Sequence, residues 1–257
     1  MRNVLFACDL DNTLLYSYKH RKAGDLCVEK IQGREQGYMT PRTTELLKAV
    51  QAVAEMVPVT SRSIEQYNRI NWPAGCTPEY AVVANGAVLL RNGEIEEGWR
   101  RDSESVVAPY MDELRSLMAE FSDREKYLRC RIVDDAYLFV YCGSGVNPED
   151  CVRAYQPRSD LNVVSSGKKV YFFPPEVNKG RALTRLKELM RPVFTVAAGD
   201  SAIDTPMLNE ADLALIPSFF PEAAIRTPTI RARGDEDSFA EFVLESVRSS
   251  ITVLRTE

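Results

Sequence analysis

The chain has 257 residues, of which 45% are hydrophobic and 27% are charged, an ordinary balance for a globular protein. Its net charge of −5 offers no basic footprint for nucleic acid. No apolar stretch approaches the roughly 20 residues that a membrane-spanning helix needs. We therefore expect neither a nucleic-acid nor a membrane partner, and a monomer or a homodimer of one or two domains.

The first third of the sequence alternates between predicted strands and helices. Residues 3–8 form an apolar run that predicts a buried strand. Residues 16–40 form a long, charged connection with a candidate hairpin near its centre. A helix is predicted to begin after Thr40, which is a good N-cap and is followed by proline. Residues 56–59 and 80–84 predict two more buried strands.

The middle of the sequence has a different pattern. An Asn-Gly pair at residues 92–93 favours a tight hairpin turn. Residues 104–121 predict one amphipathic helix, and residues 127–134 and 136–142 predict two strands with partial alternation of apolar and polar side chains. Two more strands are expected within residues 162–173. This succession is typical of an α+β unit with antiparallel strands.

The pattern of the first third returns after residue 178. Residues 179–190 predict a helix, and the apolar residues from 195 onwards predict a strand that ends in carboxylates. Residues 237–254 predict a closing helix with one apolar face. Buried strands that alternate with helices are typical of parallel sheets.

These elements together predict an α/β fold. We expect a Rossmann-like parallel-sheet core with helices on both faces, interrupted by an inserted α+β cap domain. The core would comprise residues 1–87 and 176–257, and the cap would comprise residues 88–175.

Six cysteines and a single histidine limit the chemistry that is open to the chain. No C-x-x-C pair is present, so a zinc site is not expected. Reduced cysteines pack like small apolar side chains, and reduced thiols are typical of the cytoplasm. We therefore expect a cytoplasmic location.

Two predicted strands stop abruptly at pairs of aspartates. Asp9 and Asp11 follow the first strand, and Asp200 and Asp204 follow the strand that begins at residue 195. Binding sites in open parallel sheets gather beyond the carboxyl ends of the strands, so these four carboxylates can converge at one edge. Such a cluster suits a hard cation, most commonly Mg²⁺ together with phosphate. Helix caps and solvated turns are the alternative, because aspartate is favoured in both.

The first pair of aspartates suits nucleophilic and acid–base catalysis. If Asp9 attacks phosphorus, it forms an aspartyl phosphate. Asp11 can protonate the leaving alkoxide and can later deprotonate the water that hydrolyses the intermediate.

Two further positions suit a phosphoryl group. Thr60 ends a predicted strand, where a hydroxyl and the following backbone N–H groups can bind a phosphoryl oxygen. Lys179 begins a predicted helix, and its ammonium group could neutralise charge that shifts during phosphoryl transfer. Taken alone, each has a simpler explanation, which is an ordinary helix cap for Thr60 and surface charge for Lys179.

Taken together, these residues resemble the four motifs of the haloacid dehalogenase superfamily of phosphotransferases. The sequence DLDNT at residues 9–13 resembles the first motif, Thr60 the second, Lys179 the third, and residues 199–204 the fourth. The motifs occur in order on both sides of the predicted cap. The position of the cap, after the third strand, resembles the Cof-type branch, which includes many sugar-phosphate phosphatases.

The resemblance implies a role for each matching aspartate. Asp9 would be the nucleophile and a Mg²⁺ ligand. Asp11 would be the acid–base residue and would offer its backbone carbonyl to the metal. Asp200 would bind Mg²⁺, with Asp204 as a further ligand or as support for the ligands.

The resemblance also implies a site for the phosphoryl group and the rest of the substrate. Thr60 and Lys179 would hold the phosphoryl group. Arg62 and Asn85, which lie in segments similar to those of the Cof-type branch, are candidates for the floor of the substrate site.

Two features depart from the family pattern. Ile203 stands where the family often has asparagine, so a metal or water contact is missing or comes from another residue. The connection at residues 16–40 is longer than usual and begins beside Asp9. Our hypothesis is that it folds over the site and that its basic residues Arg21 and Lys22 contact an anionic substrate. A solvated run of charges is the alternative.

The sequence thus predicts a Mg²⁺-dependent phosphatase that hydrolyses a small phosphorylated metabolite, most simply a sugar phosphate, through phospho-Asp9. A phosphomutase of the phosphomannomutase type would use the same intermediate but return the phosphoryl group to its substrate. A ligand-binding protein with little turnover on the same fold is the other alternative. Ile203 slightly favours that alternative, whereas the intact Asp9 and Asp11 argue against it.

Overall fold

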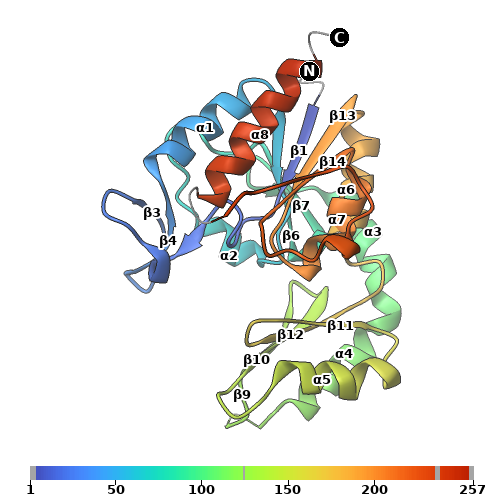
Figure 1. Cartoon of the computed structure of the whole chain (residues 1–257). Helices are drawn as coiled ribbons and strands as arrows, with labels where there is room; N and C mark the ends of the chain where they lie inside the picture. Colours follow the sequence, from blue (N-terminus) through green and yellow to red (C-terminus); the bar gives the residue numbers. More distant parts are fainter. Residues whose placement is uncertain (1–3, 124, 235–237, 255–257) are drawn as a thin grey trace.

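The computed structural model describes residues 4–123, 125–234 and 238–254. Figure 1 shows a larger unit, built from the first and last parts of the chain, and a smaller unit below it, built from the middle. The predicted strand at residues 3–8 and the predicted helix at residues 237–254 each begin with a residue that lies outside the described residues.

A parallel sheet of five strands forms the centre of the larger unit. Its order is β15-β14-β13-β1-β5, and every neighbouring pair is parallel. The strands are β1 (Val4–Cys8), β5 (Glu55–Pro58), β13 (Phe194–Ala198), β14 (Leu213–Ile216) and β15 (Thr229–Arg231). Every residue of β1 is buried, as expected for a central strand with both faces covered. The predicted parallel core is therefore confirmed.

Helices cover both faces of this sheet. Successive side chains of a strand point to opposite faces, so neighbouring residues of β1 pack against different helices. Phe6 of β1 belongs to one buried cluster, and its neighbour Leu5 belongs to a second. The helices on the side of Phe6 are α1 (Pro41–Gln51) and α8 (Phe239–Leu254), and those on the side of Leu5 are α6 (Lys179–Met190) and α7 (Thr205–Glu210). Helix α1 begins as predicted, with the Thr40 side chain as its N-cap.

Three antiparallel strands continue the larger unit beyond β5. They are β6 (Tyr80–Val83), β7 (Val88–Arg91) and β8 (Glu94–Ile95). A parallel bridge between Val59 and Val82 places β6 beside the end of β5. The predicted hairpin turn is confirmed, since Asn92 and Gly93 join β7 to β8 with φ values of 51° and 84°. The short helix α2 (Ile64–Asn68) and the 3-10 turn η2 (Ala84–Gly86) follow β5 and β6.

The long connection after β1 is an ordered small sheet. Its elements are β2 (Tyr16–Ser17), the 3-10 turn η1 (Tyr18–His20), β3 (Leu26–Ile31) and β4 (Arg34–Met39), and the strand order is β2-β4-β3. The expected hairpin is confirmed: Gln32 and Gly33, with φ values of 51° and 78°, join β3 to β4. In Figure 1 this sheet projects from the larger unit on the side where α1 begins.

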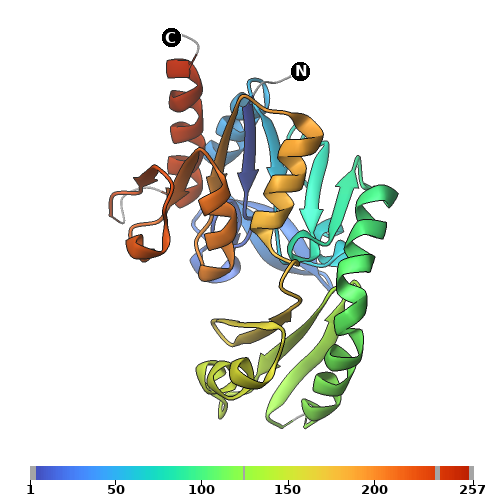
Figure 2. The ribbon, with the colours of Figure 1, turned by 90° about the vertical axis from the view of Figure 1, so that its right-hand side faces the viewer.

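The smaller unit is an antiparallel sheet with helices on one face. The sheet order is β11-β12-β10-β9. Figure 2 shows α3 running from the larger unit down to the smaller one, where α4 follows it. The elements are α3 (Glu97–Val107), η3 (Ala108–Tyr110), α4 (Met111–Glu120), β9 (Tyr127–Val133), β10 (Tyr137–Cys142), α5 (Pro148–Tyr155), η4 (Gln156–Arg158), β11 (Asn162–Ser166) and β12 (Lys169–Phe173).

The prediction of a single helix over residues 104–121 is wrong. The structure has two helices, α3 and α4, that meet at the 3-10 turn η3. Pro109 lies in that turn, and because proline lacks a backbone N–H it does not continue an α-helix.

The boundary between the two units stays a prediction. Strand β7 pairs with β6 of the larger unit, and Trp99 of α3 is buried there, where its indole N–H donates to the Gly86 carbonyl oxygen at 3.0 Å. The Arg185 guanidinium of α6 stacks on the same indole at 3.7 Å from its ring centre.

The remaining turns are η5 (Ala202–Asp204) and η6 (Glu222–Ala224). Within the described residues, no helix combines the length and the apolar character needed to cross a membrane.

Candidate active site

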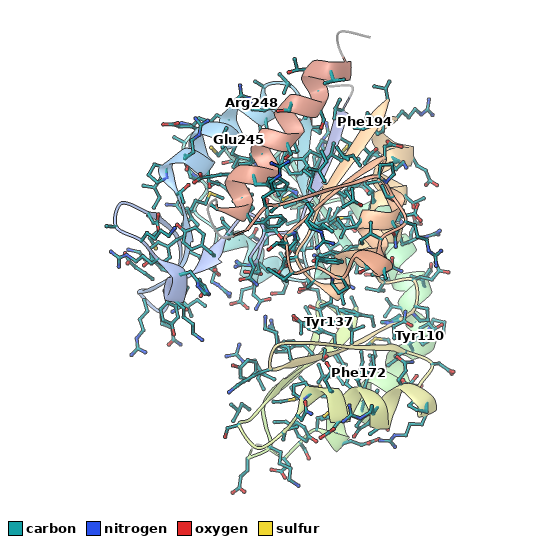
Figure 3. The ribbon with its side chains drawn as sticks, viewed as in Figure 1. Tyr110, Tyr137, Phe172, Phe194, Glu245 and Arg248 are labelled. Atoms are coloured by element: carbon teal, nitrogen blue, oxygen red, sulfur yellow. The ribbon has the colours of Figure 1, made fainter. Side chains whose placement is uncertain are left out.

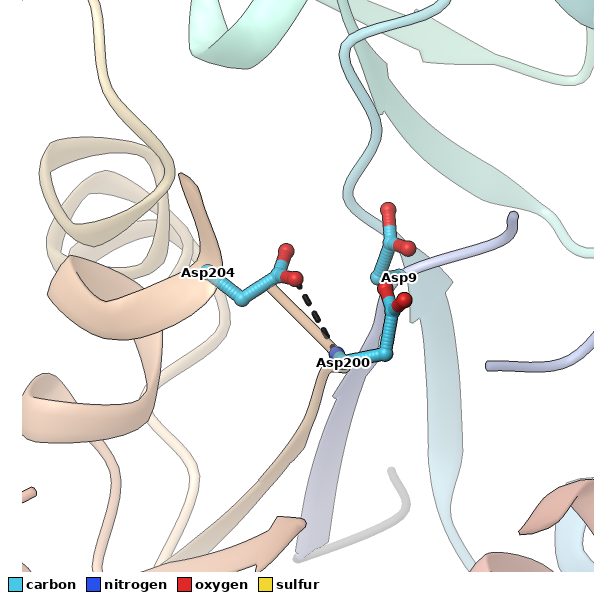
Figure 4. A group of neighbouring side chains, drawn as sticks. All are labelled: Asp9, Asp200 and Asp204. Carbon is cyan, nitrogen blue, oxygen red and sulfur yellow. Dashed lines mark hydrogen bonds between the residues drawn. The ribbon is translucent and has the colours of Figure 1, made fainter. Parts of the chain in front are cut away.

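Three of the four predicted carboxylates meet beyond the carboxyl ends of β1 and β13. These two strands are neighbours, and the Asp9 N–H donates to the Ala198 carbonyl oxygen at 2.9 Å, which holds the two strand ends together. Asp9, Asp200 and Asp204 each offer a carboxylate oxygen, and these oxygens lie within 4.8 Å of one another. Figure 4 shows the three side chains directed toward a common point.

Lys179 supplies the positive charge inside this cluster. Its Nζ lies 2.5 Å from Asp9 Oδ1 and 2.5 Å from Asp204 Oδ1, and all three side chains are buried. Lys179 is the first residue of α6, so the packing of that helix against the sheet carries the ammonium group to the strand ends. Burial lowers the pKa of Lys179, but the two carboxylates outweigh this effect and raise it above its usual value.

Backbone and hydroxyl groups of the turn after β13 hold Asp204 in place. Its Oδ2 accepts hydrogen bonds from the Asp200 N–H at 3.1 Å, from the Ser201 N–H at 2.9 Å and from the Ser201 hydroxyl at 2.9 Å. The two oxygens of the Asp204 carboxylate therefore bind different groups: Oδ1 accepts from Lys179, and Oδ2 accepts from this turn. Gly199 makes this closeness possible, because a Cβ at that position would lie 2.4 Å from Asp204 Cβ.

Replacing Gly199 with alanine is expected to displace Asp204 and to lower the free energy of unfolding by about 1–3 kcal/mol, as overpacking of a core does. Gly145→Ala is the matched control, since no neighbouring atom of the described part of the chain lies within 4 Å of a Cβ there. Chemical denaturation of both variants measures the difference. Equal stability of the two variants would contradict the close approach at Gly199.

The electrostatics of the cluster suit a divalent cation. Burial raises the pKa of Asp9 well above its usual value, although Lys179 opposes the shift. Burial and the charge of Asp204 raise the pKa of Asp200 to about 6. Three neighbouring carboxylates thus face one ammonium group, which pairs with two of them, so negative groups outnumber positive ones in this largely buried cluster. Oxygen ligands with excess negative charge are what Mg²⁺ requires, so the residues fit this metal.

Asp11 lies apart from the other three aspartates. Its carboxylate binds the Arg62 guanidinium through two hydrogen bonds, from Nε to Oδ2 at 2.9 Å and from Nη2 to Oδ1 at 2.7 Å. Desolvation raises the pKa of Asp11, but the hydrogen bonds and charge of Arg62 and the charge of Lys169 hold it below its usual value. The side chain is half exposed, and it borders the cavity described below.

Glu29 orients this arginine from the small sheet formed by residues 16–40. It is buried, and it accepts hydrogen bonds from Arg62 Nη2 at 2.9 Å and from Arg69 Nε at 3.2 Å. The residue opposite Glu29 in β4 is Gly37, which leaves room for the carboxylate. The unusual connection after the first motif therefore contributes a charged group at the edge of the site.

Thr60 and Asn85 are buried beside the strand ends. The Thr60 hydroxyl accepts a hydrogen bond from the Arg62 N–H at 3.2 Å. The N-cap of the following helix α2 is Ser63, so the alternative that Thr60 is an ordinary helix cap is wrong. The Asn85 side-chain N–H donates to the Val177 carbonyl oxygen at 3.0 Å. Its Oδ1 is buried and has no hydrogen-bond partner among the described residues. Asn85 adopts a left-handed backbone with φ of 57°.

A cavity of about 390 Å³ lies between the two units. It adjoins this cluster through Asp11 and Asn12, whereas Asp9, Lys179, Asp200 and Asp204 do not line it themselves. Asp11, Ser61 and Arg62 line it from the larger unit, and Glu29 lines it from the small sheet. The wall from the smaller unit consists of three cations, four aromatic residues and one valine: Arg129, Arg131, Lys169, Tyr137, Phe139, Tyr141, Tyr171 and Val133. Its size is in the range of ligand sites for small molecules.

The two basic residues proposed for the loop do not line this cavity. Arg21 lies 3.5 Å from Glu35 and stacks over the Tyr38 ring. Lys22 borders a separate cavity of about 200 Å³ beside α8. Their contact with substrate stays a prediction, whereas Tyr16, Ser17 and Glu29 of the same segment do reach the main cavity.

Sequence reasoning missed several residues of the site. The Ser201 hydroxyl donates to Asp204, two residues before Ile203, which stands at the position where asparagine was expected. Asn12 makes a side-chain hydrogen bond to Asp200. Glu29 was not predicted, because residues 16–40 show no long period of apolar residues that would indicate which side chains face the site. The period-two spacing of Arg129 and Arg131 in a predicted strand was a signal that places both on one face of a sheet.

Comparison with solved structures assigns the fold, which is that of phosphatases of the haloacid dehalogenase superfamily. A sucrose-phosphatase from Synechocystis sp. PCC6803, solved with sucrose and phosphate, is 17% identical with a TM-score of 0.65, covering 97% of this chain and 98% of its own. The C-terminal domain of a trehalose-6-phosphate phosphatase from C. albicans is 13% identical with a TM-score of 0.64, covering 98% and 93%. A haloacid dehalogenase-like hydrolase from B. subtilis is 19% identical with a TM-score of 0.61, covering 96% and 99%.

At these identities the similarity is one of fold. No protein-family model matches the sequence, and no match was found among the curated proteins. The activity therefore has to be argued from the residues of the site.

Proposed function

We propose that this protein is a Mg²⁺-dependent phosphatase that hydrolyses a small phosphorylated metabolite through an aspartyl phosphate on Asp9. The observation that carries the proposal is the pairing of buried Lys179 with buried Asp9 and Asp204, with partly buried Asp200 beside them, at the carboxyl end of a parallel sheet and near a cavity of about 390 Å³. The solved structures with this fold include phosphatases for sucrose phosphate and trehalose 6-phosphate, which supports a sugar phosphate as the substrate class.

The residues divide the reaction between them. An Asp9 carboxylate oxygen attacks phosphorus, and the bond from phosphorus to the ester oxygen breaks. Asp11 donates a proton to the leaving alkoxide and then accepts one from the water that attacks phospho-Asp9. Lys179 and Thr60 hold phosphoryl oxygens. Before it can act, Asp11 must share or release Arg62, which binds both of its oxygens in the present structure.

A magnesium ion would be held by the carboxylates of Asp9 and Asp200 and by the backbone carbonyl of Asp11, with Asp204 as a ligand or as support. When bound, it would supply positive charge that neutralises the phosphoryl group and aligns the attack. Arg62 and Asn85 would contact the substrate. We place the protein in the cytoplasm, acting as a monomer or a homodimer.

Phosphate release in the presence and absence of metal tests the proposed activity. The protein is assayed over a panel of phosphorylated sugars, nucleotides and phospho-acids with Mg²⁺, with EDTA, and after Mg²⁺ is added back. We expect turnover with Mg²⁺, loss of turnover with EDTA, and recovery on re-addition, because three carboxylates without a metal repel the phosphoryl group.

Other results of the same assay point to the alternatives. Isomerisation of a hexose phosphate without net phosphate release would indicate a phosphomutase. Mg²⁺-dependent binding without turnover over the whole panel would indicate a ligand-binding protein on this fold.

A further inference from the structure

The antiparallel sheet β11-β12-β10-β9 of the smaller unit, which we call the cap sheet, carries different side chains on its two faces because strand residues alternate. Leu138, Val140 and Phe172 point to one side, where Phe172 packs against Phe121 and Tyr155 beneath the helices. The opposite side presents rows across β9, β10 and β12: Arg129, Tyr141 and Lys169 in one row, and Arg131, Phe139 and Tyr171 in the next. In Figure 3, Tyr137 lies on the side that faces the larger unit and Phe172 on the side of α5.

One end of this face is fixed to the larger unit beside the aspartates. The Tyr137 hydroxyl donates to the Ser61 carbonyl oxygen, one residue after Thr60. Asp134, in the turn between β9 and β10, accepts a hydrogen bond from the Ile64 N–H at 2.8 Å. The rows that contain Arg131 and then Arg129 follow from this end toward the opposite end of the strands. A ligand whose phosphoryl group lies at Asp9 would therefore extend along these rows.

The charges that line the cavity do not balance. Among the described residues that line it, five side chains are cationic and two are anionic. Asp11 and Glu29 are the partners of Arg62 and Arg69. Among the described residues, no carboxylate forms an ion pair with the other three cations, which are Arg129, Arg131 and Lys169. Asp134 acts on Arg131 only through its charge, since its Oδ2 is occupied by the Ile64 N–H.

Arg131 has an unsatisfied donor in this wall. Its Nε is buried and has no hydrogen-bond partner among the described residues. A buried donor without a partner costs free energy, and a charged one costs more. The neighbouring Phe139 and Tyr171 supply aromatic surface on which the middle of a ligand can pack. The wall thus offers three cations and one unused donor beside an apolar platform.

We propose that Arg129, Arg131 and Lys169, the cap cation cluster, form a second anion site, so that the substrate is a phosphomonoester with a second anionic group at its far end. A carboxylate or a second phosphoryl group has the required chemistry, because both accept charge-assisted hydrogen bonds from guanidinium and ammonium groups. This inference rests on the proposed phosphatase function and deepens it. Asp134 acts on Arg131 and Asp11 acts on Lys169 only through their charges, so a neutral sugar at this place would leave the three cations without an ion-pair partner among the described residues.

Matched pairs of compounds test the second anion site. 6-Phosphogluconate is compared with glucose 6-phosphate, which lacks the carboxylate, and fructose 1,6-bisphosphate is compared with fructose 6-phosphate, which lacks the second phosphoryl group. We expect the wild-type protein to prefer the member of at least one pair that has the second anionic group, as measured by kcat/KM. Which pair shows the preference identifies the anion.

Charge-removing variants assign that preference to the cluster. Arg129→Gln, Arg131→Gln and Lys169→Gln are each expected to reduce the preference roughly tenfold, the scale of one lost hydrogen bond to a charged group. Lys168→Gln is the matched control, because Lys168 is exposed, adjoins Lys169 and does not line the cavity; it should keep the full preference. Lys169→Arg should keep most of it. Equal kcat/KM values within both pairs, or an equal loss for both members of a pair, would overturn the inference.

Binding separates this inference from the proposed function. Calorimetric titration of the same four compounds in the presence of Mg²⁺ gives their affinities whether or not they are hydrolysed. Tighter binding of an anionic member without phosphate release would support the anion site and contradict the phosphatase. Phosphate release with no difference in affinity within either pair would do the reverse.

Discussion

The Asp9→Asn variant is expected to release phosphate at least about 10⁴-fold more slowly than the wild-type protein, as the loss of a covalent nucleophile does in other enzymes. The amide oxygen of asparagine is a poor nucleophile, and the substitution also removes a charge that Lys179 and a metal would use. The change is nearly isosteric, so the fold should persist. Steady-state assays with the best substrate of the panel measure the loss, and circular dichroism checks the fold.

Asp112→Asn is the control for this substitution. Asp112 lies on α4 in the smaller unit, and its side chain is 99% exposed. It does not belong to the cluster of Asp9, Lys179, Asp200 and Asp204. Its variant should keep wild-type turnover. If Asp9→Asn retained activity within about tenfold of that control, phosphorus would not be attacked by Asp9, and the proposed mechanism would be wrong.

The second large effect is expected from Lys179→Met. Lys179 is 2% exposed and pairs with both Asp9 and Asp204. Removing one member of a buried ion pair leaves uncompensated charge, which costs about 3–5 kcal/mol. We expect a loss of this order in the free energy of unfolding in EDTA, together with loss of phosphatase activity. Urea denaturation monitored by fluorescence measures the stability.

Two comparisons make this measurement specific. Lys187→Met changes a lysine in the last turn of the same helix, where the ammonium group donates to the Glu210 carbonyl oxygen at an exposed place, so its effect should stay below about 1 kcal/mol. Added Mg²⁺ should restore part of the stability of Lys179→Met, because a cation bound among the aspartates replaces some of the missing charge. A Lys179→Met protein as stable as Lys187→Met would show that the buried charges are not coupled as the distances imply.

The core of the fold was readable from the sequence because its signals are local. The apolar run of β1 and the one before Asp200 are short, continuous and followed by carboxylates, which is the pattern of buried parallel strands. The cap of α1 at Thr40 and the turn at Asn92 depend on side chains a few residues apart, and both were predicted. Each of these features is decided within a few residues of chain.

Predictions that depended on longer-range packing were less complete. The apolar spacing continues across Pro109, so the sequence pattern predicted one helix. Proline cannot donate a backbone hydrogen bond, and the segment is divided into two helices there. The four carboxylates were expected to converge at one edge of the sheet. Asp9, Asp200 and Asp204 form one group there, whereas the Asp11 carboxylate binds Arg62. That arginine is held by Glu29, from a segment whose sequence has no long period.

The sequence alone thus determined the parallel core, the inserted cap and the grouping of Asp9, Asp200 and Asp204, because strand period and strand order carry residues to a common edge. Only the tertiary structure decided what surrounds that edge. The contact between Glu29 and Arg62 joins residues 33 positions apart, and the contact between Tyr137 and Ser61 joins residues 76 positions apart. The face of the cap sheet that meets the cavity depends on which side α4 and α5 cover. These pairings follow from packing between elements, and no local pattern encodes them.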